Sequence, residues 1–114
     1  MSAFCYHDKF SDTMAVVFKE IVSCVKKPNP DILDIPAGAG RLSDRLREEG
    51  FKVVSADIND SRDEYVFADM NRDLPFPDEQ FAAVISMEGI EHIINYQGFI
   101  SELSRVTRRG GPSY

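Results

Sequence analysis

Apolar residues recur at helical spacing, every three or four positions, in three segments of the chain. These segments cover residues 11–26, 40–49 and 95–108. Residues that end helices follow each of them, most clearly Gly50 after the second and Pro112 after the third. The expected buried positions on these helices are Met14, Val17, Phe18, Ile21, Val25, Leu42, Leu46, Phe99, Ile100, Leu103 and Val106.

Four shorter apolar runs are typical of β-strands and cover residues 31–36, 51–57, 65–69 and 81–87. The last run is almost continuously apolar, which indicates a strand covered on both faces. Strands joined by helices or long crossovers form a parallel sheet with right-handed connections. The pattern therefore predicts an α/β fold, a Rossmann-like and mostly parallel sheet with flanking helices.

The chain has 114 residues, which is enough for one compact domain. We expect residues 1–30 to form a helical segment that packs on a core made by residues 31–114. Acidic residues outnumber basic ones by 19 to 13, so we do not expect nucleic acid as a partner. The basic cluster of Arg105, Arg108 and Arg109 lies where the last helix should end, and a favourable interaction with the helix dipole explains it most simply.

The cysteines and the N-terminal residues favour an intracellular protein. Cys5 and Cys24 are too few for a disulfide framework, and the first residues lack the charged and apolar regions of a signal peptide. No apolar run approaches the ~20 residues that cross a bilayer. We therefore expect a cytoplasmic protein without a membrane partner.

The segment Asp31–Gly40 reads as a buried strand, a glycine-bearing turn and the start of a helix. Gly38 and Gly40 allow the backbone to turn tightly and a ligand to approach it closely. Asp57 follows Gly38 by 19 residues, at the end of the next strand, where an acidic side chain can bind ribose hydroxyls. Asp69 ends the third strand at the same edge. This arrangement predicts a nucleoside-containing cofactor at the carboxyl edge of the sheet.

Each carboxylate also has a simpler explanation. Asp34 lies inside an apolar strand, where an unpaired carboxylate is costly. It either faces the crevice, where it organises the loop or accepts a bond from a bound cation, or is satisfied by loop amide groups. Asp57 and Asp69 could each cap a turn instead of binding ribose and adenine. The common position of the three side chains at one edge is a stronger argument than any one of them.

Further acid–base residues follow the fourth strand, namely Glu88, Glu91 and His92. A Glu–His pair could ligate a metal or transfer protons. No second histidine or cysteine stands at ligand spacing, so no metal is expected. These residues are near the expected reaction point, but none can be assigned as a catalytic residue.

The ordered set of motifs resembles class I S-adenosylmethionine-dependent methyltransferases, especially their small-molecule branch. Residues 32–40 are similar to the first motif of that family, Asp57 to its ribose-binding acidic residue, and 68–70 to its adenine-binding segment. Residues 74–81, 86–92 and 105–111 resemble segments that come later in the sequences of that family. The chain is thus similar to the N-terminal half of the class I methyltransferase fold, truncated after the fourth strand.

This resemblance implies S-adenosylmethionine as the cofactor and a small-molecule methyl acceptor, which remains unassigned. It implies that Asp34, Gly38 and Gly40 line the methionine end of the cofactor. Asp57 would hold the ribose, and Asp69 with its neighbour the adenine. The full set of expected cofactor-binding residues is Asp34, Pro36, Ala37, Gly38, Gly40, Asp57, Ile58, Asp69, Met70 and Met87.

The chain departs from the family in three respects. Pro36 replaces the usual first glycine, which stiffens the turn and removes one N–H donor. Ala82 stands where the family often has an aspartate. The family's sheet normally continues beyond the four strands expected in this chain, which would leave the fourth strand at an open edge. We expect a second copy, another subunit or a structural rearrangement to cover that edge.

Methyl transfer is the leading functional hypothesis. The alternative is a truncated, catalytically incomplete module that binds the cofactor or a partner protein. A nicotinamide-dinucleotide domain is disfavoured, because Ser43 stands where the G-x-G-x-x-G pattern needs glycine or alanine.

Overall fold

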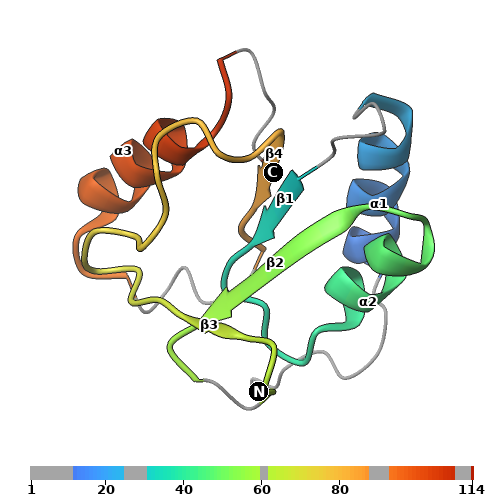
Figure 1. Ribbon diagram of the computed structural model, residues 1–114, viewed down its shortest axis with the longest axis horizontal. Helices are drawn as coiled ribbons and strands as arrows, with labels where there is room; N and C mark the ends of the chain where they lie inside the picture. The colour runs from blue at the N-terminus through green and yellow to red at the C-terminus, as the bar shows by residue number, and fades with distance from the viewer. Residues whose placement is uncertain (1–11, 25–30, 60–61, 88–92, 110–113) are drawn as a thin grey trace.

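The computed structural model of the chain describes residues 12–24, 31–59, 62–87, 93–109 and 114. Helices and strands follow one another in the order that the sequence predicts, with shorter ends (Figure 1). In chain order they are α1 (Asp12–Cys24), β1 (Asp31–Asp34), α2 (Arg41–Glu48), β2 (Lys52–Asp57), β3 (Val66–Phe67), β4 (Ala83–Ile85) and α3 (Tyr96–Val106).

The strands form one parallel sheet in the order β3-β2-β1-β4. Asp34 of β1 lies beside Ser55 of β2 on one side and beside Ile85 of β4 on the other. The chain winds outward from β1 through β2 and β3, and then crosses back to β4 on the opposite side of β1. Because the winding reverses at β1, the turn after this strand lies at the switch point where α/β sheets bind ligands. The predicted α/β fold is confirmed.

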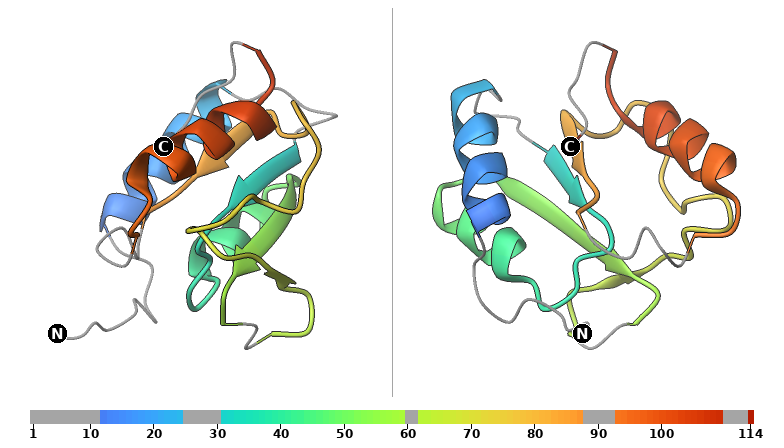
Figure 2. Two further views of the ribbon diagram at one scale, coloured as in Figure 1. Left: turned by 90° about the vertical axis from the view of Figure 1, so that its left-hand side faces the viewer. Right: turned by 180° about the vertical axis from the view of Figure 1, so that it is seen from behind.

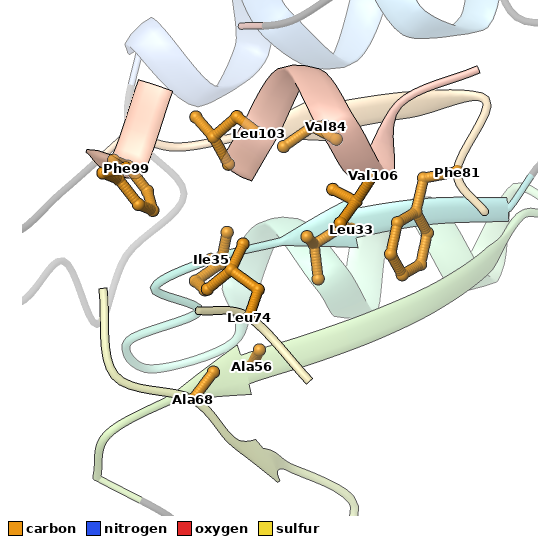
Figure 3. Packing of buried hydrophobic residues seen from close by; sticks show 10 residues of the cluster. All are labelled: Leu33, Ile35, Ala56, Ala68, Leu74, Phe81, Val84, Phe99, Leu103 and Val106. Carbon is orange, nitrogen blue, oxygen red and sulfur yellow. The ribbon is translucent and has the colours of Figure 1, made fainter. Parts of the chain in front are cut away.

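Helices cover both faces of the sheet, α1 and α2 on one face and α3 on the other (Figures 1 and 2). Successive strand residues point to opposite faces, so Ile32 packs with α1 and α2 while Leu33 packs with α3. Figure 3 shows the core on the α3 side, made by Leu33, Ile35, Ala56, Ala68, Leu74, Phe81, Val84, Phe99, Leu103 and Val106. The opposite core contains Met14, Ile21, Ile32, Leu42, Leu46, Phe51, Ala83 and Ile85.

Helix α1 supplies Met14 and Ile21 to the second core. The boundary expected at residue 30 lies outside the described residues, so the division into an N-terminal segment and a core domain stays a prediction. In the described parts of the chain, none of the helices has the length and apolarity that crossing a bilayer would require.

The buried face of α3 is narrower than the sequence suggests. Phe99, Leu103 and Val106 are buried, as expected from their helical spacing. Ile100 is 47% exposed, so its assignment to the buried face is wrong. Residues four and then three positions apart form a single stripe on a helix, and Ile100 lies on the flank of that stripe. Val25, another expected core residue, lies outside the described residues.

The expected strands 65–69 and 81–87 shrink to the short strands β3 and β4. The expected strand 31–36 ends at Asp34, although the N–H of Ile35 still donates to the Ile85 carbonyl at 2.9 Å. Pro36 follows and has no N–H with which to continue the pairing.

The outer edge of β4 is partly covered by the chain itself. After α3, Thr107 forms a parallel bridge with Phe81. Farther along the edge, the N–H of Tyr114 donates to the Val84 carbonyl at 2.8 Å, and Ser86 N–H donates to the Tyr114 carbonyl at 2.6 Å. The segment after α3 therefore lies alongside β4 at these points, where the sequence suggested an open edge. Coverage by a second copy or another subunit stays a prediction.

Arg105 fastens a loop to α3, which the helix-dipole explanation missed. Its guanidinium donates to the carbonyls of Leu74 at 3.1 Å and Phe76 at 2.9 Å. It also pairs with Glu102 at 2.7 Å and Asp78 at 2.8 Å. The preference of a helix C-terminus for cations is a weak, screened effect, whereas these bonds fix the path of residues 74–78.

Candidate functional site

The turn between β1 and α2 has a backbone that requires glycine at two positions. Gly38 has φ 58° and Gly40 has φ 84°, a region that other L-residues rarely adopt. The N–H of Ala37 donates to the Ala56 carbonyl of β2 at 3.0 Å, and Gly40 N–H closes the turn on the Ala37 carbonyl at 2.9 Å. Gly40 then caps α2. The turn thus brings its backbone to the carboxyl edge of β1 and β2.

Asp57 ends β2 and holds this turn from the neighbouring strand. It is 9% exposed, its Oδ2 accepts the Gly38 N–H at 2.9 Å, and its Oδ1 accepts the Asn59 N–H at 3.0 Å. The bond from Asn59 is the local turn cap that the sequence left open, and the bond from Gly38 joins the two predicted motifs. A carboxylate has about four acceptor positions, so each oxygen can accept a second hydrogen bond.

A buried polar layer lies beneath the turn, between α2 and the sheet. The Asp34 side chain, in a residue only 4% exposed, accepts the Ser43 hydroxyl at 2.7 Å. Ser55 donates to Ser43 at 2.7 Å, and Arg47 donates to the Ser55 hydroxyl at 2.9 Å. Asp34 and Ser55 are register partners on the α2 face of adjacent strands. The polar residue inside β1 is therefore satisfied in part by α2, which the sequence did not suggest.

Two further residues that the sequence did not single out, Arg62 and Tyr65, contact the glycine turn. The Tyr65 hydroxyl donates to the Gly38 carbonyl at 2.7 Å, and Arg62 Nη2 donates to the Ala39 carbonyl at 2.6 Å. Arg62 also forms a two-pronged pair with Asp44 of α2, at 2.8 and 3.0 Å. The sequence offers little signal for these contacts, because residues 59–64 form only a short polar segment and Tyr65 falls in the expected strand 65–69.

The electrostatics of this cluster keep Tyr65, Asp44 and Arg62 in the protonation states that their hydrogen bonds require. Burial raises the pKa of Tyr65 above its ordinary value, so the phenol remains a neutral donor at neutral pH. The hydrogen bond from Arg62 lowers the pKa of Asp44, although burial opposes this shift. The Asp44 carboxylate raises the pKa of Arg62 in turn. Arg62 therefore stays charged and paired while it holds the turn.

Asp69 follows β3 at the same edge as Asp57. The Ala68 N–H donates to the Asp57 carbonyl at 3.1 Å, which places the two chain segments side by side. The Asp69 Oδ1 accepts the Asn71 N–H at 2.9 Å, and Arg72 lies 3.5 Å from its Oδ2. This is the local turn bond that the sequence left as an alternative, and it leaves acceptor positions on both oxygens.

The remaining expected site residues differ in exposure. Pro36 and Ala37 are half-buried in the turn, and Ile58 is 57% exposed just beyond Asp57. Met70 packs against the core on the α3 side and Met87 against the opposite core. All of these residues follow the ends of parallel strands, so the structure gathers the expected set along one edge, with Asp34 beneath it.

The acid–base residues Glu88, Glu91 and His92 lie outside the described residues, so no catalytic group is assigned. Within the described ranges, no group of three His, Cys, Asp or Glu side chains is placed to hold a metal ion.

The chain is similar to known proteins over most of its length. The profile of a family described as "Methyltransferase domain" matches residues 33–114. A demethylmenaquinone methyltransferase of Clavibacter sepedonicus is 37% identical over 93 residues, which cover 70% of this chain and 38% of the relative. The chain spans about 40% of the length of the curated relatives it matches.

Solved structures share the fold. A candidate methyltransferase from Bacillus halodurans aligns with a TM-score of 0.73 and 26% identity, over 89% of this chain and 48% of its own. The 1,6-didemethyltoxoflavin-N1-methyltransferase of Burkholderia thailandensis aligns with a TM-score of 0.67 and 15% identity, over 85% and 47% of the two chains. That structure contains bound S-adenosylhomocysteine and 1,6-didemethyltoxoflavin.

Proposed function

The chain belongs to the methyltransferase domain family, and we propose that it binds S-adenosylmethionine at the carboxyl edge of its sheet for methyl transfer to a small-molecule acceptor. The observation that carries this proposal is the bond between the Gly38 N–H and the Asp57 carboxylate at 2.9 Å. It joins the glycine turn and the acidic strand end, the two parts of a nucleoside site, at the switch point of the sheet.

The residues present fit the cofactor in three ways. Asp57 keeps one acceptor position on each oxygen, which suits the two hydroxyl donors of a ribose diol. The glycine turn allows close approach of a ligand to the backbone. Asp69 lies one strand farther along and keeps acceptor positions for an adenine amino group.

The proposed cofactor-binding set follows from the family resemblance and from these positions. The turn would receive the methionine end, Asp57 the ribose, and Asp69 with Met70 the adenine. The complete set is Asp34, Pro36, Ala37, Gly38, Gly40, Asp57, Ile58, Asp69, Met70 and Met87. Asp34 lies beneath the turn and accepts the Ser43 hydroxyl of α2, so in this set it would act by anchoring the helix that follows the turn.

The cofactor, when bound, supplies an activated methyl group on a sulfonium centre. The residues of this chain bind it, orient it and exclude water around it. S-adenosylmethionine as cofactor is also supported by the structural relative that contains S-adenosylhomocysteine.

The acceptor is the less defined part of the proposal. Relatives named as demethylmenaquinone methyltransferases make demethylmenaquinone the first acceptor to assay with this chain. Cofactor binding without methyl transfer to any acceptor would favour the second candidate function, a cofactor-binding module. A cytoplasmic location and an oligomer stay predictions.

The first experiment is titration calorimetry of the chain with S-adenosylhomocysteine. We expect Asp57→Asn to weaken binding at least tenfold, roughly the effect of losing hydrogen bonds to a charged group. Asp73→Asn serves as the control, because Asp73 is an exposed carboxylate in the loop beyond Asp69. Absence of binding to the unmodified chain at millimolar ligand would refute the cofactor proposal, and equal binding by the Asp57 variant would refute the assigned ribose site.

A further inference from the structure

Arg62 and Tyr65 hold the glycine turn from outside the two motifs that define the site. They share one short turn, in which the Tyr65 N–H donates to the Arg62 carbonyl at 3.0 Å. Their side chains bond to consecutive carbonyls of the glycine turn, Tyr65 to Gly38 and Arg62 to Ala39. The Arg62 guanidinium also lies over the Tyr65 ring, 5.8 Å from its centroid. The two side chains therefore act on the turn as one unit.

Bonds to the carbonyls also determine the direction of the N–H groups of the turn. A trans peptide unit is planar, and its C=O and N–H point in opposite directions. When Tyr65 holds the Gly38 carbonyl, the Ala39 N–H of the same peptide unit is directed away from Tyr65. Arg62 likewise orients the unit that carries the Gly40 N–H, which donates to the Ala37 carbonyl. The Gly40 N–H is thus used within the turn, and the Ala39 N–H is the donor that points away from the two side chains.

The space around Gly40 is used by the same pair. A Cβ at this position would lie 2.7 Å from both the Arg62 Cζ and the Tyr65 hydroxyl. Arg62 cannot move aside freely, because Asp44 and Glu64 hold its guanidinium at 2.8 and 3.2 Å. Glycine is therefore needed at position 40 for two reasons. It adopts the positive φ, and it leaves space for the Arg62 and Tyr65 side chains.

We propose that Arg62 and Tyr65 are positioning residues, which hold the peptide units on either side of the Ala39 Cα and so direct the Ala39 N–H toward the amino-acid end of the bound cofactor. This inference rests on the proposed function. A backbone N–H that is already aimed at a carboxylate binds it without the cost of ordering the loop. The side chains of Arg62 and Tyr65, which lie 23 and 27 residues along the chain from the carbonyls they bind, supply that ordering.

The test compares two ligands that differ in the amino-acid part. S-adenosylhomocysteine carries it, and 5′-methylthioadenosine lacks it. We expect Tyr65→Phe, which removes one hydroxyl and keeps the ring, to weaken S-adenosylhomocysteine about five- to tenfold in calorimetry. Affinity for 5′-methylthioadenosine, measured by competition, should change less than about twofold. Arg62→Lys should behave similarly, because lysine keeps the charge but cannot form the two-pronged pair with Asp44.

Tyr96→Phe is the matched control, since Tyr96 is 52% exposed at the start of α3. The urea midpoint of each variant without ligand shows whether a loss of affinity comes with global destabilisation. Equal loss of both ligands, or unchanged affinity for S-adenosylhomocysteine in both variants, would overturn the inference. A failure of the unmodified chain to bind S-adenosylhomocysteine would instead remove the proposed function itself.

Discussion

Two arginines fasten two loops of this protein with nearly the same chemistry. The side chains of Arg62 and Arg105 are both 31% exposed. Arg62 donates to one carbonyl of the glycine turn and pairs with Asp44 and Glu64. Arg105 donates to two carbonyls of residues 74–78 and pairs with carboxylates on α3 and in the loop. In each case one guanidinium group connects the backbone carbonyls of a loop to nearby carboxylates.

The difference lies in what each loop does. The turn held by Arg62 contributes to the carboxyl edge of the sheet, where we propose that the cofactor binds. The loop held by Arg105 leads from β3 to the start of β4 and carries core residues, among them Phe76, whose ring meets Phe81 edge-on at 5.2 Å. Under the proposed function, the same set of arginine contacts serves ligand binding at the glycine turn and stability of the fold at residues 74–78.

The largest expected effect follows from Arg105→Gln. The variant loses ion pairs with Glu102 and Asp78 and at least one bond to a loop carbonyl, so we expect destabilisation of about 2–3 kcal/mol. Urea denaturation measures this, with the exposed Arg109→Gln as a control that should change stability by less than about 0.5 kcal/mol. Affinity of the folded variant for S-adenosylhomocysteine should be unchanged. A loss of affinity for S-adenosylhomocysteine in the folded variant would show that Arg105 also supports ligand binding, against the distinction drawn between the two arginines.

A smaller effect is expected for Gly40→Ala. Alanine at φ 84° costs about 1–2 kcal/mol of conformational free energy, and its Cβ would meet Arg62 and Tyr65. Gly50→Ala is the matched control, because Gly50 has φ 98° at the end of α2, away from the turn. Gly40→Ala should lose more stability in urea than Gly50→Ala, because its Cβ adds the contacts with Arg62 and Tyr65 to the cost of the positive φ. Only Gly40→Ala should also weaken S-adenosylhomocysteine binding. Similar ligand affinity in the two variants would contradict the proposed role of the turn.

The local features of the site could be predicted from the sequence. Strand periodicity placed β1 and β2, and the ends of parallel neighbours necessarily meet at one edge. The glycines and Asp57 were therefore expected together, and the bond between Gly38 and Asp57 agrees with this. Such predictions succeed because they depend on residues within one strand–turn–helix unit or on the register of adjacent strands.

The contacts that fasten the loops could not be predicted in this way. Arg62 reaches Ala39 across 23 residues, and Arg105 reaches Phe76 across 29. The periodicity of helices and strands gives no information on such pairs, because a long side chain at the end of an element can contact any loop that packs beside it. For this reason the helix dipole was the simplest expectation for Arg105, and the β4 edge was expected to be open although Tyr114 pairs with it.

The smallest expected effect is the acid dependence of stability at the two arginine clusters. Hydrogen bonding from Arg105 lowers the pKa of Glu102 below its ordinary value of 4.5, and hydrogen bonding from Arg62 lowers that of Asp44 below 3.8. Folding therefore favours the ionised form of each carboxyl group. The stability that each pair contributes is complete above the unfolded-state pKa and is lost as the pH falls through the folded-state pKa.

The Glu102 contribution should begin to fall at higher pH than that of Asp44, because its unfolded-state pKa is higher. It should also be the larger, since the Glu102 side chain is 15% exposed and that of Asp44 is 41% exposed, so solvent screens the second pair more strongly. Urea denaturation at a series of pH values from about 6 to about 3 measures both effects. Glu102→Gln should flatten the acid limb of the stability curve more than Asp44→Asn does. The reverse order would show that the turn cluster, although more exposed, contributes more to the stability of the fold than the α3 cluster.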